Sequence, residues 1–285
     1  MSRLNRRGFL VPAALVLGFA FLYVPILSMM LFSFNNSRLV TVWDSANSPT
    51  VKWYVALFRN RQILDAAWLS IKIAAVTATG AAVLGTLAGL VLARFGRFKG
   101  RALLSAMTTA PLVMPEVITG LSLLLLFVAL EQLIGWPEGR GVTTITIAHV
   151  TFSMSYVAVV VQSRLASFDE SLEEAAMDLG APPPRVFRRI TLPLIFPAIL
   201  SGWLLAFTLS WDDLVISQFV AGPGSTTLPM VIFSKVRLGV SPDVNALASI
   251  MVLLVATGVV VSAVFMRRRE RRLKREMQMA QADGT

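Results

Sequence analysis

Apolar runs of membrane-crossing length recur along the whole chain, and no other feature restricts the fold as strongly. The hydrocarbon core of a bilayer is about 30 Å thick, so a helix needs roughly 20 apolar residues to cross it. Of the 285 residues, 55% are hydrophobic and 15% are charged. The sequence therefore predicts an all-α, polytopic membrane protein. We expect one transmembrane domain over residues 1–285, with crossings at about 9–32, 68–92, 103–130, 142–162, 194–220 and 245–266.

Lysine and arginine are unevenly divided between the segments that join these runs. Of the 26, 18 lie in alternate segments beginning with the N-terminal one, 7 lie in the segments between them, and Lys72 lies inside the second run. Because cytoplasmic segments are richer in these residues, both termini are expected in the cytoplasm. Lipid headgroups, rather than nucleic acid, account for the net charge of +10 and for the basic tail at 267–285.

The N-terminal sequence NRRGFLV resembles a twin-arginine export signal. However, the uncharged stretch from Gly8 to Ser37 is far longer than the apolar region of a signal peptide, which has 7 to 15 residues, and no A-x-A cleavage site follows it. We therefore expect a first transmembrane helix that is retained.

The longest inner loop, residues 163–193, predicts two short helices. Ser171 and Glu174 have the spacing of a capping box, which would start a helix at Leu172. Gly180 suits the left-handed position after a helix, and the prolines at 182–184 stop that helix and can start the next. An apolar face then comprises Leu172, Ala175, Ala176 and Leu179.

Charge is segregated along this loop, with acids in its first half and arginines in its second. A helix that lies on an anionic membrane surface would be basic, whereas the first helix here is acidic and has a narrow face built largely from alanine. Such a face fits a groove in another protein. The alternative is a solvated hairpin whose acids only balance the nearby arginines.

Seven positions of the loop match the complete motif EAA-x3-G-x9-I-x-L-P. On these residues the chain resembles the membrane subunits of bacterial ABC importers. The stretches at 22–43, 109–130, 202–230 and 239–248 extend the resemblance to the polyamine branch of that family, and to its putrescine permeases in particular. The motif positions are Glu174, Ala175, Ala176, Gly180, Ile190, Leu192 and Pro193.

The resemblance implies a type I importer permease fold in a bacterial inner membrane. The loop would be a coupling helix seated in a groove of an ATPase, with Glu174 making polar contacts, Ala175 and Ala176 allowing close seating and Gly180 giving the bend. The implied partners are a second homologous permease, two ATPase copies and a periplasmic polyamine-binding protein. The chain has no G-x-x-x-x-G-K-[ST] phosphate loop. We therefore expect no enzyme activity and no cofactor in this chain, with ATP and Mg²⁺ on the ATPase.

Three carboxylates within the apolar runs are candidates for the substrate pathway, because an unpaired charge in the bilayer is costly. Glu116 follows Pro111 and Pro115 and is expected in the middle of the third crossing. Asp212 and Asp213 lie toward the outer end of the fifth, and as neighbours on a helix they point about 100° apart. Carboxylates suit a diammonium substrate. The alternative for the aspartates is an ion pair with Lys72.

Three weaker signals have simpler explanations. His149 has no partner evident in the sequence, so hydrogen-bonded packing is favoured over a ligand role. Trp203, Phe207 and Trp211 form a stripe at helical spacing that suits packing better than ammonium binding. The G-x-x-x-G of Gly85 and Gly89 indicates close helix packing.

Two other classes of protein remain as alternatives. A secondary transporter would more often show an internal repeat, and the motif loop would have no purpose in it. A membrane enzyme would need a catalytic constellation, and the sequence has one histidine and no cysteine. Within the importer family, spermidine, iron, sulfate or an amino-acid derivative are the alternative substrates.

Overall fold

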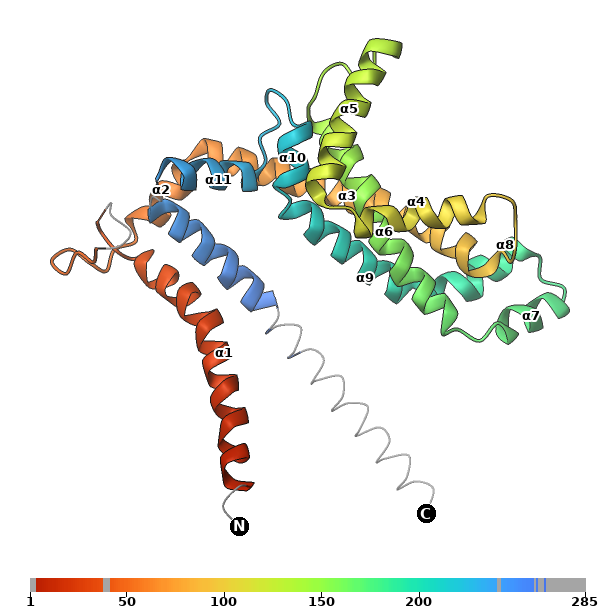
Figure 1. Cartoon of the computed structure of the whole chain (residues 1–285), viewed down its shortest axis with the longest axis horizontal. Helices are drawn as coiled ribbons and strands as arrows, with labels where there is room; N and C mark the ends of the chain where they lie inside the picture. Colours follow the sequence, from red (N-terminus) through yellow and green to blue (C-terminus); the bar gives the residue numbers. More distant parts are fainter. Residues whose placement is uncertain (1–3, 38–41, 240–241, 259, 261–263, 265–285) are drawn as a thin grey trace. The chain divides into compact units, whose positions relative to one another are not determined.

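A computed structural model describes residues 4–37, 42–239, 242–258, 260 and 264. The regular secondary structure of the described residues is all helical, without a strand, which confirms the predicted all-α fold (Figure 1). Five helices are long and apolar enough to cross a membrane: Leu10–Phe32, Arg61–Arg94, Glu116–Ile134, Val142–Ala166 and Pro183–Trp211. A shorter apolar helix, Pro242–Gly258, coincides with the start of the sixth expected run. The rest of that run and the basic tail at 267–285 lie outside the described residues, apart from residues 260 and 264.

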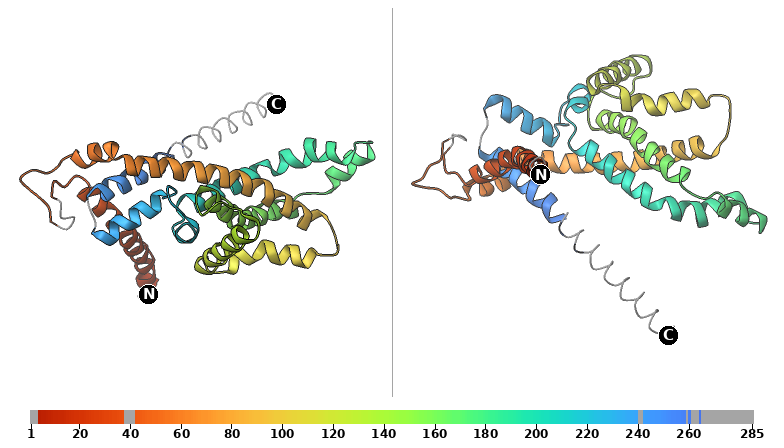
Figure 2. Two further views of the ribbon diagram at one scale, coloured as in Figure 1. Left: turned by 90° about the horizontal axis from the view of Figure 1, so that it is seen from above. Right: turned by 60° about the horizontal axis from the view of Figure 1, so that its bottom comes forward.

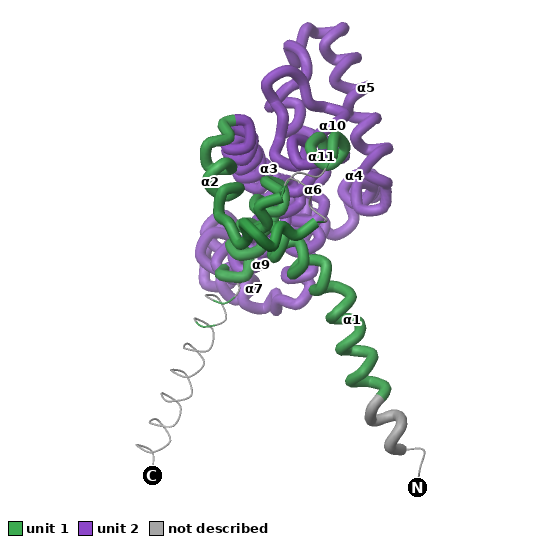
Figure 3. The backbone as a smooth tube through the Cα atoms, turned by 90° about the vertical axis from the view of Figure 1, so that its left-hand side faces the viewer, with its two compact units in different colours: residues 1–61, 234–285 green, residues 62–233 purple. Residues whose placement is uncertain are grey.

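The chain divides into two compact units, residues 1–61 with 234–285, and residues 62–233 (Figure 3). The first unit contains α1 (Leu4–Phe32) and α2 (Lys52–Arg59), a short helix that includes Trp53. Between them the polar segment folds back on itself. The Trp53 indole donates to the Asn35 carbonyl over 2.7 Å, and the Thr50 amide donates to the Phe34 carbonyl over 2.8 Å.

The second unit is built around α6, with α3 and α9 packed against it. These helices span Arg61–Arg94 (α3), Val142–Ala166 (α6) and Leu192–Trp211 (α9). Figure 2 shows α6 and α9 running side by side. Val157 of α6 is fully buried and faces a glycine on each neighbour, Gly85 of α3 and Gly202 of α9. A Cβ on Gly85 would lie 2.6 Å from the Met154 carbonyl oxygen, so the helices approach closely, as the G-x-x-x-G spacing predicted.

The run at 103–130 is not one helix. It divides into α4 (Arg101–Val113) and α5 (Glu116–Ile134), and Met114 between them has an extended backbone. Pro115 has no N–H to donate and disfavours helical backbone in the residue before it, which accounts for the break. Glu116 is therefore the first residue of α5, and its expected position in the middle of a helix was wrong.

The fifth run is also interrupted. The helix α9 ends at Trp211, and a short helix α10 (Val215–Val220) follows after a three-residue break and packs on α5. A loop over 221–227 then leads to α11 (Leu228–Leu238), and the Leu228 amide donates to the buried Ser70 hydroxyl of α3 over 2.8 Å. The break leaves the first amides of α10 without helical partners, and the side chain of Asp213, which lies within the break, accepts two of them.

Candidate functional site

The acidic helix of the 163–193 loop is α7 (Ser171–Asp178), and its cap differs from the predicted one. The capping box of Ser171 with Glu174 does not form, and the helix starts at Ser171 rather than at Leu172. Instead, the Asp169 carboxylate accepts the Ser171 amide proton over 3.0 Å. This bond, with a second from the Ser171 side chain, lowers the pKa of Asp169 below its ordinary value.

The bend after α7 forms as the sequence predicted. Gly180 has a φ of +81°, and its amide donates to the Met177 carbonyl while the Ala181 amide donates to the Ala176 carbonyl. This is the Schellman arrangement, which satisfies the last carbonyls of a helix. The next helix, α8 (Pro183–Val186), starts on two prolines and continues through a π-helical turn, η1 (Phe187–Thr191), into α9.

None of the residues of α7 is buried. Leu172 is 50% exposed and Leu179 just beyond the helix is 90% exposed, although both belong to the predicted apolar face. Glu174 is also exposed and forms no ion pair within the described part of the chain. The described residues therefore leave Glu174 and most of the apolar face uncovered, which fits a surface that docks on another protein.

Glu173, one position before the motif, lies differently. Its carboxylate contacts Arg94, the last residue of α3, and accepts the Thr191 hydroxyl proton over 2.5 Å. In Figure 1 the helices α7 and α8 lie together at one end of the second unit. Sequence reasoning missed this contact, because Glu173 lies outside the motif and no pattern in the sequence connects it to Arg94.

The remaining motif residues lead back into α9. Ile190 belongs to the π-helical turn, and Leu192 and Pro193 are the first two residues of α9. Beside them, three arginines and two prolines line a cavity of about 520 Å³. The lining residues are Pro182, Pro184, Arg185, Arg188 and Arg189. The loop thus carries its acids on α7 and its bases on α8 and η1.

A second polar cluster fills the break between α9 and α10. His149 of α6 is buried, its Nδ1 lies 2.7 Å from the Ser210 hydroxyl, and its Nε2 lies 3.1 Å from the Asp213 carboxylate and 3.2 Å from the Ser217 hydroxyl. A ring that donates from Nε2 to the Asp213 carboxylate can accept the Ser210 hydroxyl proton at Nδ1. His149 is therefore a hydrogen-bonded packing residue, as expected, and the carboxylate beside it belongs to Asp213.

Asp213 also holds the start of α10. Its carboxylate accepts the Ser217 amide proton over 2.7 Å and the Ile216 amide proton over 3.3 Å, and its side chain is 8% exposed. These are the amides that the break leaves without helical partners. The predicted alternative, an ion pair of the aspartates with Lys72, is wrong among the described residues, because Asp213 pairs with His149.

Replacing Asp213 by alanine should lower stability by about 2 kcal/mol, because it leaves the His149 N–H and the first-turn amides of α10 without an acceptor. The matched asparagine variant keeps a carbonyl oxygen and should cost clearly less. Thermal melting of the purified subunit in detergent measures both. An alanine variant as stable as the asparagine one would contradict this role.

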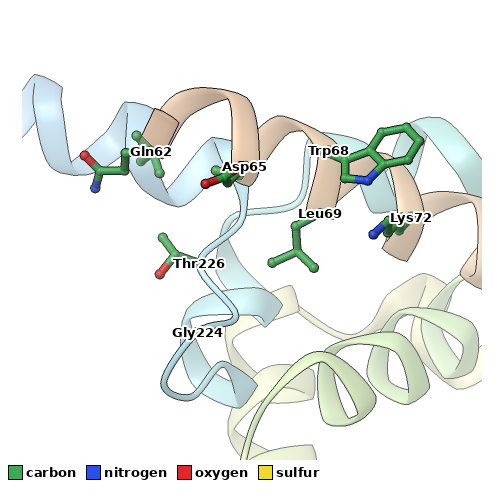
Figure 4. Close-up of a pocket in the computed structure, with 9 residues that line it drawn as sticks. Gln62, Asp65, Trp68, Leu69, Lys72, Gly224 and Thr226 are labelled. Carbon is green, nitrogen blue, oxygen red and sulfur yellow. The ribbon is translucent and has the colours of Figure 1, made fainter. Parts of the chain in front are cut away.

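Lys72 lies instead in a cavity of about 450 Å³ between α3 and the 221–227 loop (Figure 4). Its ammonium nitrogen lies 5.2 Å from the centre of the Trp68 ring. Asp65 and Gln62 line the same cavity from α3, and Thr226 lines it from the loop. The cavity has one acid and one base, so its charge is balanced and does not favour a cation.

The predicted pathway carboxylates are not brought together. Glu116 is exposed at the start of α5, and Asp212 is exposed at the end of α9, whereas Asp213 is held in the His149 cluster. The aromatic stripe of α9 does form. The Trp203 and Phe207 rings stack at 5.5 Å, Phe207 and Trp211 stack at 6.1 Å, and the Trp203 indole donates to Thr79 of α3.

Comparisons with known proteins agree with this architecture. Residues 85–275 match the family model described as the inner membrane component of binding-protein-dependent transport systems. The putrescine transport system permease protein PotI of Escherichia coli K12 is 58% identical over 268 residues, covering 93% of this chain and 94% of the relative. The spermidine/putrescine permease protein PotC of the same strain is 40% identical, covering 94% and 96%.

Solved structures share the fold at low sequence identity. A bacterial ABC transporter that imports the acidic polysaccharide alginate aligns with a TM-score of 0.68 at 17% identity, covering 94% of this chain and 98% of that one. The MetNI methionine ABC transporter in an inward-facing conformation aligns with a TM-score of 0.58 at 16% identity, covering 70% and 92%. With its helical membrane architecture and its motif loop, the chain belongs to the family of inner membrane components of binding-protein-dependent transport systems.

Proposed function

We propose that this chain is a permease subunit of an ATP-driven importer that carries a polyamine, putrescine above all, across the bacterial inner membrane. The observation that supports it most strongly is the 58% identity, over nearly the whole chain, to a putrescine transport permease. The 40% identity to spermidine/putrescine permeases makes spermidine the second candidate substrate.

Energy enters through the coupling loop, residues 163–193. The exposed face of α7 docks in a groove of an ATPase partner, which holds ATP and Mg²⁺. Ala175 and Ala176 let the helix backbone approach, Glu174 makes polar contacts, and Gly180 turns the chain away. Ile190, Leu192 and Pro193 join this docked segment to α9. Two features support this assignment: the exposed apolar face of α7, and the exposed carboxylate of Glu174, which has no ion pair among the residues that the structure describes.

The working importer combines this chain with a second homologous permease, two ATPase copies and a periplasmic binding protein that delivers the polyamine. A solved structure that shares the fold, a bacterial alginate ABC transporter, was crystallised in complex with a periplasmic protein bound to alginate pentasaccharide. Alternating access follows when the ATPase pair displaces α7.

For the substrate route, we propose Glu116 and one of the adjacent aspartates as weak, transient acceptors for ammonium groups. Asp212 is the better candidate of the pair, because its side chain is exposed while that of Asp213 is occupied by His149 and α10. Weak binding suits transport, since a deep site would trap the substrate.

The test is uptake of labelled putrescine by vesicles that contain this chain with its partners, competed by excess spermidine, iron, sulfate or amino acids. We expect ATP-dependent uptake that only polyamines reduce. In the Glu116→Gln variant, uptake should fall several-fold. Uptake without ATP would contradict the importer, and failure of polyamines to compete would contradict the substrate.

A further inference from the structure

Arg94 joins the end of α3 to the start of α7. Its guanidinium forms an ion pair with Glu170, the residue before α7, and its Nε lies 3.4 Å from the Glu173 carboxylate in the first turn of that helix. The same guanidinium lies over the Phe168 ring, 5.6 Å from its centre. One arginine thus fixes the beginning of α7 to a membrane-spanning helix.

Glu173 extends this contact to a second span. Its other carboxylate oxygen accepts the Thr191 hydroxyl proton over 2.5 Å, and Thr191 is buried at the end of η1, directly before α9. π-Helical turns within α-helices are frequent at functional sites. A single side chain on α7 therefore contacts Arg94 at the end of α3 and Thr191 directly before α9.

Burial decides which of the two glutamates matters more. Arg94 is 16% exposed and Glu173 is 17% exposed, whereas Glu170 is 62% exposed. Water screens an exposed ion pair, and such pairs contribute little. Removing Glu173 would leave a largely buried guanidinium without its buried partner, and the Nε and Nη2 atoms of Arg94 already lack a hydrogen bond. Glu173 is the stronger link.

We propose that Arg94, Glu173 and Thr191 form a clamp that transmits displacement of α7 to α3 and α9. The inference rests on the proposed function, because it assumes that an ATPase moves α7. The clamp gives the neighbouring residues Glu173 and Glu174 different roles. Glu174 faces outward toward the partner, and Glu173 faces inward and passes the motion to the membrane helices. The clamp residues are positioning residues and do not contact substrate.

The experiment is a double-mutant cycle in the complete importer, reconstituted in vesicles, with Arg94→Gln, Glu173→Gln and both together. The measured quantity is putrescine moved per ATP hydrolysed. Each single variant should lower this ratio at least about five-fold, the low end of typical coupling between sites. The double variant should be no worse than the worse single one, because both remove one interaction. Glu170→Gln, the matched control on the same arginine, should remain near wild type.

Two results would overturn the clamp. Losses that add in the double variant would mean that Arg94 and Glu173 act separately. Failure of the single variants to retain the ATPase on purification would mean that the contacts only maintain the structure of the loop.

A spectroscopic readout separates the clamp from the proposed substrate. The chain contains no cysteine, so spin labels can be attached at introduced cysteines in place of Phe95, just after α3, and Met177 on α7, both exposed. The distance between them should stay constant when ATP binds to the wild-type importer and change when ATP binds to the Arg94→Gln variant. A distance that changes equally in the wild type and in the variant would contradict the clamp, whether or not putrescine is carried. If putrescine uptake is absent but the wild-type distance stays constant, only the proposed substrate is contradicted.

Discussion

The Glu174→Lys variant is expected to take up no substrate although it inserts in the membrane in normal amounts. Glu174 is exposed and forms no ion pair within the described part of this chain, so reversing its charge should leave the subunit itself intact. If α7 docks in an ATPase groove as proposed, the change places a lysine where the partner would contact the carboxylate of Glu174. The loss of one partner in a buried polar contact costs about 2 kcal/mol or more, roughly thirty-fold in affinity.

The measurements are ATP-dependent uptake and the amount of ATPase that is retained when the subunit is purified. Glu138→Lys is the matched control, because Glu138 is also exposed and lies in the loop between α5 and α6, away from the coupling loop. It should leave uptake and ATPase retention unchanged. Normal uptake by the Glu174 variant would contradict the docking of α7.

Local features of the fold could be predicted from the sequence because their causes are local. A glycine at +81° and a run of prolines act on the residues beside them, so the bend after α7 followed from Gly180 and its neighbours. The long helices could be predicted for the same reason, because each corresponds to a continuous apolar run in the sequence. The break before Glu116 was also signalled, since Pro115 forbids continuous helix there. The error was to weigh the apolar run above the proline.

Contacts between distant residues could not be predicted in this way. Asp213 and His149 are 64 positions apart, and Arg94 and Glu173 are 79 apart, so only the packing of α3, α6 and α9 brings each pair together. The sequence showed that an aspartate in this region needs a partner, but it pointed to Lys72 and not to His149, which is the partner that Asp213 has in the structure. Likewise, the sequence does not show that Glu173 lies on the side of α7 that faces the rest of the chain, whereas Glu174 lies on the exposed side.

The second large expected effect is a loss of stability in the Gly85→Val variant, because α3 and α6 approach closely at this glycine. A Cβ at Gly85 would lie 2.6 Å from the Met154 carbonyl oxygen and 2.7 Å from the Val157 Cβ. Both belong to the α6 helix, whose backbone and buried side chain cannot move aside, and Gly202 of α9 packs against Val157 from another helix. The valine therefore has to push α3 and α6 apart.

Separating the helices should cost more than about 3 kcal/mol, at the upper end for an overpacked core, and should lower the melting temperature by roughly 10 °C. Thermal melting in detergent and the yield of monodisperse subunit measure this. Gly18→Val in α1 is the matched control, since it puts the same side chain in an apolar helix where no described atom lies within 4 Å of the new Cβ. We expect the loss at Gly85 only, because only there does the new side chain meet another helix. An equal loss in both variants would show that valine destabilises these helices through its low helix propensity. The close contact of α3 with α6 would then not be what holds this unit together.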